Sequence, residues 1–174
     1  MYKDSDPNGE WGVVHTDNFQ LNDNHKHRIF IIDDFYTNPK ELRNFAINQW
    51  FFDDEGFEGL RTRKQFFFKG VKEKFEETIG EKITVWEEHG MNARFQSHKA
   101  DFRPVYHCDS QTWAAAWYGN IDAPYEAGTS FYAHKETGLR GGEDNIGAAF
   151  AGDTWVDPTP YVRIDHAANI FNRL

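Results

Sequence analysis

From about residue 83 onward, the chain is divided into short runs of β-branched and aromatic residues separated by Gly, Pro, Asn and Asp. Such runs are typical of short β-strands joined by turns. They cover residues 83–89, 93–99, 102–108, 112–119 and 128–135. Several short strands at this spacing predict a sandwich or a barrel.

The segment before residue 83 predicts one strand followed by a helix. Residues 29–32 are all Ile or Phe, which favours a buried strand. In the helix that follows, Asn38 is placed to cap, with Pro39 at the first helical position and Glu41 completing a capping box. We expect its buried face to consist of Leu42, Phe45, Ala46 and Trp50.

A second amphipathic helix is predicted over residues 71–79. Val71, Phe75 and Ile79 form its apolar face, and Gly80 is a plausible C-terminal stop. Both helices are expected to cover a sheet. The fold class is therefore α+β and mostly β, with two N-terminal helices against the strands.

Length and composition limit the organisation of the chain. With 174 residues, we expect a polar leader over 1–27 and a single domain over 28–174. The leader lacks the basic start and apolar core of a signal peptide, and the chain has 1 Cys, so we expect a cytoplasmic protein without disulfides. Residues 138–160 predict a long loop, where we expect specificity to reside.

The charge of the chain argues against nucleic acid as a direct partner, although it leaves a nucleotide-sized substrate open. The formal net charge is −9 and Lys and Arg form no block, so no nucleic-acid backbone binding is expected. No apolar run approaches the ~20 residues of a membrane span. The expected partner is a small-molecule or protein substrate.

The strongest candidate site is His107-Cys108-Asp109. On a strand, alternate residues share a face, so His107 and Asp109 suit two ligands on one ion while Cys108 points into the core. His-x-Asp is a short pattern and recurs at His15-Thr16-Asp17, where the polar surroundings favour a solvated loop. The residues around the motif therefore carry the argument.

A series of motifs gives His107 and Asp109 a specific context. In order, these are "FIIDDFYTNPKELRNFA", "GLRTR", "YHCDSQTWAAAWYGN", "EAGTSFYAHK" and "NIFNRL". The series resembles the small bacterial and phage branch of the Fe(II)- and 2-oxoglutarate-dependent oxygenases. This resemblance implies a double-stranded β-helix, or jelly-roll barrel, with His107 and Asp109 as two ligands of a catalytic Fe(II).

The resemblance also implies a reaction. Two imidazoles and one carboxylate on one face of an ion leave positions open for a bidentate 2-oxo acid and O₂. The expected activity is a hydroxylase that uses 2-oxoglutarate as co-substrate. Its substrate is not identified by the sequence.

The third ligand is the point at which this chain departs from the family pattern. The family places a second His, then an Arg or Lys, beyond a segment like "NIFNRL", whereas the sequence given ends at Leu174. Because residues 168–174 alternate like a strand, we expect further residues after them. His166 as a substitute ligand, or an inactive site, are the other hypotheses. An inactive site would make the protein a structural or binding module, for example a phage particle (virion) component, and a homo-oligomer is a possible assembly.

Other residues have weaker claims to a role. His134 is expected near the site as a pocket or surface residue, and Lys135 as a solvated cation. Arg61 and Arg63 are expected at the barrel opening, in substrate contact or in surface pairing. The remaining residues considered are expected in solvated positions or in the core: His25, His27, His89, His98, Tyr106, Trp113, Trp117 and Tyr118.

Overall fold

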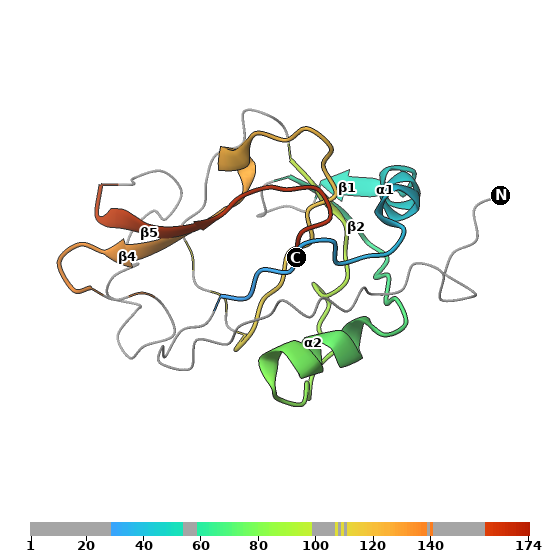
Figure 1. Cartoon of the computed structure of the whole chain (residues 1–174), viewed down its shortest axis with the longest axis horizontal. Coiled ribbons are helices and arrows are strands. Elements are labelled where there is room, and N and C mark those ends of the chain that lie inside the picture. Colours follow the sequence, from blue (N-terminus) through green and yellow to red (C-terminus); the bar gives the residue numbers. More distant parts are fainter. Residues whose placement is uncertain are drawn as a thin grey trace.

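The computed structural model describes residues 29–53, 59–98, 107, 109, 111–138, 140 and 159–174. Its elements follow the order α1, β1, β2, α2, β3, η1, β4 and β5. In Figure 1 the β4–β5 ribbon extends to one side, while α1, β1 and β2 lie on the other and α2 lies apart from both. The Cys108 and Tyr106 predictions, the His25 and His27 pair and most of the 138–160 loop fall outside the described residues.

Helix α1 (Pro39–Ile47) forms where its sequence predicts, and its buried residues are Leu42, Phe45 and Ala46. Two details differ from expectation. The Asn38 side chain makes no capping hydrogen bond, so the predicted capping box does not form. Trp50 lies beyond the helix and is 78% exposed, because the chain has already turned into β1.

Helix α2 (Val71–Ile79) also matches the prediction. Val71 is buried and Phe75 packs against the core. Gly80 ends the helix in the left-handed region at φ 74°, and its N–H donates to Glu76 O. A residue with a β-carbon is strained there, so glycine is the favoured stop.

The strands within the described residues form two antiparallel sheets. β1 (Phe51–Asp53), β2 (Leu60–Thr62) and β3 (Gln96–Ser97) lie in the order β1-β2-β3. β4 (Thr129–His134) pairs with β5 (Tyr161–Ala167), with a register shift between Phe131 and Tyr132. η1 (Tyr125–Ala127) precedes β4.

A mixed α/β arrangement is confirmed, and the two predicted helices are present. The described strands do not close into a barrel, so the jelly roll stays a prediction. β4 matches the run at 128–135, whereas the predicted strands at 83–89 and 112–119 are wrong because these segments contain no strand. β5, in contrast, was not predicted.

The predicted buried strand at residues 29–32 is also wrong. Ile29 and Ile31 are exposed, and only Ile32 enters the core. Ile32 N–H donates to Leu174 O and Leu174 N–H donates to Ile32 O, both at 2.9 Å. The segment therefore lies beside the C-terminal residues, as Figure 1 shows.

The core is built mainly from aromatic rings. Phe35 and Leu42 are fully buried, and Phe45 packs edge-on against Phe66 at 5.2 Å between ring centroids. Edge-to-face pairs of this kind add stabilisation beyond the area they bury. Trp117 packs against the cluster as a partly buried residue, which agrees with its predicted core position.

Asn172 is a polar residue buried beside this apolar core. It is 3% exposed and adopts φ 66°. Its Oδ1 accepts from Tyr36 N–H at 2.9 Å and from Trp117 Nε1–H at 3.1 Å. Its Nδ2 donates to Tyr36 O at 2.9 Å. The side chain thus joins three segments that are distant in sequence.

Next to Asn172, an ion pair fixes the same C-terminal segment at the surface. Arg173 Nε and Nη2 donate to the two carboxylate oxygens of Asp33 at 2.6 and 2.9 Å. This bidentate contact lowers the pKa of Asp33 below its usual range, chiefly through the hydrogen bond from Arg173.

The expected strand at 168–174 does not form, and residues 171–172 make a turn instead.

Substitution of Asn172 tests its role. Asn172→Gly tolerates the positive φ but leaves the N–H and carbonyl of Tyr36 and the part-buried indole N–H of Trp117 without this partner, so we expect the free energy of unfolding to fall by about 3 kcal/mol. Asn172→Ala should lose roughly 1 kcal/mol more through backbone strain. Urea denaturation measures both. The control is Asn48→Ala, which removes an exposed hydrogen bond to Asn44 O and should cost about 0.5 kcal/mol or less. Equal effects of Asn172→Gly and Asn48→Ala would contradict this role.

The Asp33–Arg173 pair predicts a pH dependence. Because the folded pKa of Asp33 is depressed, its stabilisation is present above the unfolded pKa of about 3.9 and is lost as pH falls through the folded value. The carboxylate is half-exposed, so at pH 7 Asp33→Asn should cost only about 0.5 kcal/mol. The free energies of unfolding of wild type and Asp33→Asn, measured from pH 7 to pH 2, should converge at the acid end. Asp34→Asn, with the same charge change, is the control, and an unchanged gap at low pH would refute the assignment.

Candidate metal site

The predicted ligands His107 and Asp109 lie together. His107 Nε2 is 3.4 Å from Asp109 Oδ1. Their side chains are 62% and 47% exposed, so both remain accessible to solvent. The prediction that the two side chains share one side of the chain therefore agrees with the structure.

The contact also sets the charge state of Asp109. The hydrogen bond from His107 lowers the pKa of Asp109, and the positive charge of His107 acts in the same direction, while partial burial opposes both. Asp109 is thus held as a carboxylate, the form in which it binds a metal.

This donor pair fits part of the site that the resemblance implies. A divalent first-row ion with bonds of about 2.1 Å places neighbouring octahedral ligands roughly 3 Å apart. The 3.4 Å between His107 Nε2 and Asp109 Oδ1 is close to that separation. Imidazole and carboxylate are also two of the ligand types of the facial triad that holds Fe(II) in oxygenases.

Among the residues that the structure describes, no third ligand joins His107 and Asp109. Within these ranges, no three His, Cys, Asp or Glu side chains form a group that could hold a metal ion. The ligand set is therefore incomplete in the described part of the chain.

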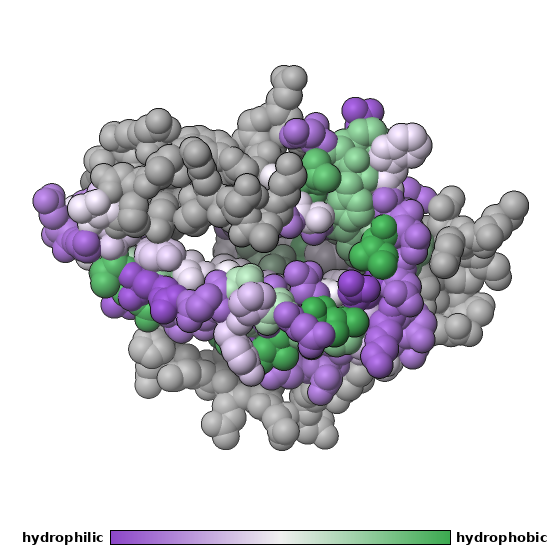
Figure 2. Space-filling view, turned by 90° about the horizontal axis from the view of Figure 1, so that it is seen from above, coloured by the Kyte–Doolittle hydropathy of each residue, from purple (hydrophilic) through white to green (hydrophobic). Residues whose placement is uncertain are grey.

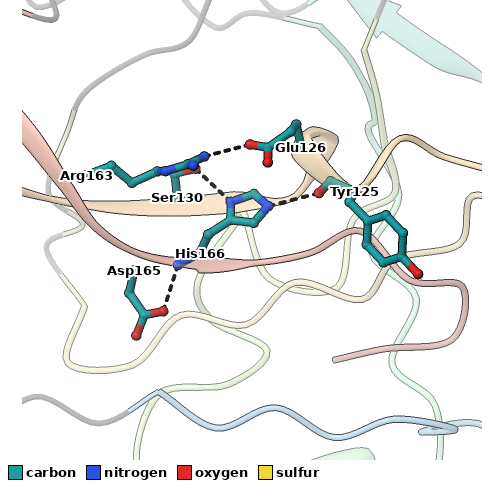
Figure 3. A network of polar contacts seen from close by, with 6 residues as sticks. All are labelled: Tyr125, Glu126, Ser130, Arg163, Asp165 and His166. Carbon is teal, nitrogen blue, oxygen red and sulfur yellow. Dashed lines mark hydrogen bonds and ion pairs between the residues drawn. The ribbon is translucent and has the colours of Figure 1, made fainter.

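His166, the alternative third ligand, occupies a different network (Figure 3). Its Nε2 donates to the Tyr125 carbonyl at 2.9 Å, and its Nδ1 lies 2.8 Å from Ser130 Oγ. In a neutral imidazole, this arrangement makes Nδ1 the acceptor of the Ser130 hydroxyl proton. His166 would have to give up one of these bonds to bind a metal.

The remainder of that network links β5 to η1. Arg163 Nη1 donates to Glu126 Oε2 at 2.6 Å, and Asp165 Oδ1 accepts from the His166 backbone N–H at 2.8 Å. Asp165 does not bind the imidazole ring in Figure 3, so Ser130, His166 and Asp165 do not form a catalytic triad. The network ties the β4–β5 ribbon to the turn before it.

His134 and Lys135 lie at the far end of β4. His134 Nδ1 is 3.0 Å from Thr137 Oγ1, and its ring packs edge-on against Tyr161. Lys135 Nζ donates to Thr159 O at 2.5 Å. Lys135 is exposed, as expected for a solvated cation, and it also donates to a backbone carbonyl.

Arg61 and Arg63 lie on or directly after β2. Arg63 covers the ring of Phe52 at 4.1 Å, and Phe52 stacks on Trp50 at 5.9 Å with an interplanar angle of 7°. A cation over a ring face is attracted by the ring's quadrupole. Surface pairing is thus observed for Arg63, and Trp50 belongs to this stack.

Sequence reasoning passed over Gln111, which makes a contact close to the candidate ligands. Its Nε2 lies 2.7 Å from His89 Nε2. Gln111 follows Asp109 by two residues, so the alternation that paired His107 with Asp109 could have indicated it. His98 makes a similar contact with Gln96 Nε2 at 2.5 Å, next to β3.

On the face seen in Figure 2, hydrophobic side chains form separate patches among hydrophilic ones. Neither helix in the described ranges has the length and apolar character that crossing a membrane requires.

Comparisons with protein-family models, curated proteins and solved structures find no match to this chain. The resemblance to the oxygenases therefore stays a prediction from the sequence motifs.

The His107–Asp109 contact predicts a measurable change. Because His107 lowers the pKa of Asp109, His107→Ala should raise that pKa toward its ordinary value. Carboxyl ¹³C chemical shifts followed through a pH titration measure it. His98→Ala is the control and should leave the Asp109 curve in place. An Asp109 pKa that is the same in wild type and His107→Ala would contradict the contact.

Proposed function

We propose that this chain carries the iron site of an Fe(II)- and 2-oxoglutarate-dependent oxygenase of the hydroxylase type. The observation that supports this proposal is the approach of His107 Nε2 to Asp109 Oδ1 at 3.4 Å. The surrounding sequence, "YHCDSQTWAAAWYGN", resembles the metal-bearing segment of that family. Fe(II) is the proposed cofactor and 2-oxoglutarate the co-substrate.

His107 and Asp109 have defined roles in this proposal. His107 would bind the metal through its neutral Nε2 and Asp109 through its carboxylate. A bound metal would replace the direct His107–Asp109 contact that lowers the pKa of Asp109 in the described structure. Fe(II) with 2-oxoglutarate and O₂ supplies the oxidising chemistry: one oxygen atom enters succinate as CO₂ leaves, and the other enters a substrate C–H bond.

The exposure of the two ligands bears on the substrate. Both side chains are open to solvent in the described structure, which permits entry of a small molecule or of a side chain on a protein. We assign the substrate specificity to the loop over residues 138–160, of which the structure describes only the two ends. A cytoplasmic location and a possible homo-oligomeric assembly belong to the same proposal.

Anaerobic Fe(II) titration with and without 2-oxoglutarate tests this function. Wild type should develop the weak visible charge-transfer band of a 2-oxo acid chelated to Fe(II). His107→Ala and Asp109→Ala should lose the band, because each removes one of the two ligands. Circular dichroism of each variant separates loss of metal from loss of folding.

Two further variants sharpen the result. His98→Ala, which removes an imidazole elsewhere, should retain the band. His166→Ala decides the third ligand: retention shows that His166 is not required, and loss with an intact fold makes it a ligand. A folded wild-type protein without any band would overturn the proposal and favour the alternative, an inactive jelly-roll structural or binding module such as a phage particle component.

A further inference from the structure

Among the described residues, Trp50 is the most exposed large hydrophobic side chain, at 78%. It lies between the end of α1 and the start of β1, on the other side of the molecule from the β4–β5 ribbon (Figure 1). The turn that precedes it is fixed, because Gln49 N–H donates to Ala46 O and Gln49 Nε2 donates to Phe45 O, both at 3.0 Å. The structure therefore holds a large aromatic ring in water at a defined place.

The Trp50 indole is stacked on a second ring. Its centroid lies 5.9 Å from that of Phe52, and the two ring planes differ by 7°. Phe51, the neighbour of Phe52 in β1, pairs with Thr62, which is 1% exposed. Because successive side chains of a strand point to opposite faces, Phe52 lies on the outer face of the sheet. Aromatic side chains that gather on a surface, rather than lying singly, are typical of interaction sites.

Arg63 adds a cation to this stack. Its Cζ lies 4.1 Å from the centroid of the Phe52 ring. The ring attracts the charge but provides no oxygen or nitrogen acceptor for the N–H groups of the guanidinium. Asp and Glu outnumber Lys and Arg by 28 to 19 in the chain, yet no carboxylate among the described residues pairs with Arg63. Arg63 is therefore placed to donate these N–H groups to an anion.

We propose that Trp50, Phe52 and Arg63 form a binding site for a purine nucleoside monophosphate. The bicyclic base stacks on the exposed Trp50 indole, and the phosphate accepts hydrogen bonds from the Arg63 guanidinium. An aromatic side chain is a suitable platform for a nucleobase, and the planar guanidinium matches the geometry of a phosphate. Trp50 and Arg63 both contact the Phe52 ring, so the ribose between base and phosphate spans the distance from one to the other.

The ring and the charge together define this class of ligand. A neutral sugar would stack on the indole but leave the guanidinium without a partner, and a small acid without a ring would leave the indole in water. A nucleic-acid strand carries a charge on every nucleotide, which disfavours its binding to a chain of net charge −9 without a block of Lys and Arg. The occupant is therefore a single nucleotide. This site is independent of the proposed iron site, since neither His107 nor Asp109 takes part.

Nuclear magnetic resonance titrations with AMP, adenosine and inorganic phosphate test the site. The indole N–H signal of Trp50, identified by its absence from Trp50→Phe, should shift with AMP. Adenosine should shift the same signal but bind about tenfold more weakly, because it lacks the charged hydrogen-bond acceptor of the phosphate. Inorganic phosphate should leave the signal in place, since it has no ring to stack.

Substitutions separate the two contacts, and broadening of the adenine proton signals follows binding in every variant. Arg63→Ala should weaken AMP binding by about tenfold and leave adenosine binding unchanged. Trp50→Ala should weaken the binding of both by about tenfold, because each depends on stacking. Arg63→Lys keeps the charge without the planar guanidinium and should recover part of the AMP affinity.

Arg163→Ala is the matched control. It removes the same charge from β5, in the ribbon on the other side of the molecule (Figure 1), and should bind AMP as wild type does. Trp50 and Arg63 are exposed, so their variants should fold, and circular dichroism checks this.

Four results would overturn the proposal. The first is a folded wild type whose Trp50 signal does not respond to AMP. The second is unchanged AMP affinity in Trp50→Ala or in Arg63→Ala. The third is an equal loss in Arg163→Ala, because the effect would then come from the overall charge. The fourth is tighter binding of a single-stranded oligonucleotide than of AMP, which would assign this surface to nucleic acid instead of a free nucleotide.

Discussion

The side chain of Asn172 adds hydrogen bonds inside the core between segments that backbone hydrogen bonds of residues 172–174 also join. A buried amide is costly unless its hydrogen bonds are made. Here the backbone of Tyr36 and the indole of Trp117 provide the partners. The backbone exchange between Ile32 and Leu174 and the ion pair of Asp33 then follow from the same placement of the C-terminal segment. Packing between apolar rings is non-directional. Hydrogen bonds are directional, so those of the Asn172 amide help to define which segments lie together.

The position of the candidate metal site depends less directly on these contacts of the C-terminal segment. His107 and Asp109 meet because they are two residues apart, which is a local property of the chain. Local proximity does not fix where the pair lies in the fold. Just after the pair, Gln111 contacts His89 and Trp113 packs on Phe30, so this part of the chain is joined to the turn after α2 and to the segment beside the C-terminal residues.

Histidine content alone would have suggested more metal ligands than the described structure offers. The imidazoles of His89, His98, His134 and His166 each bind a neighbouring side chain or a backbone carbonyl. His166 uses both ring nitrogens, which makes it a structural link between β5 and η1. His107 differs from them because the structure places its ring beside a carboxylate, that of Asp109.

The sequence by itself determined the elements whose causes are local. Both helices, the stop at Gly80, the β4 run and the pairing of His107 with Asp109 follow from residues a few positions apart. The tertiary structure alone decided the features whose partners are distant. The 29–32 segment lies beside the C-terminal residues, Trp50 lies outside the core, and β5 forms against β4 although its own residues alternate weakly. Asn172 and Gln111 belong with these, because a polar side chain shows its role only when the groups it satisfies are brought within hydrogen-bond distance.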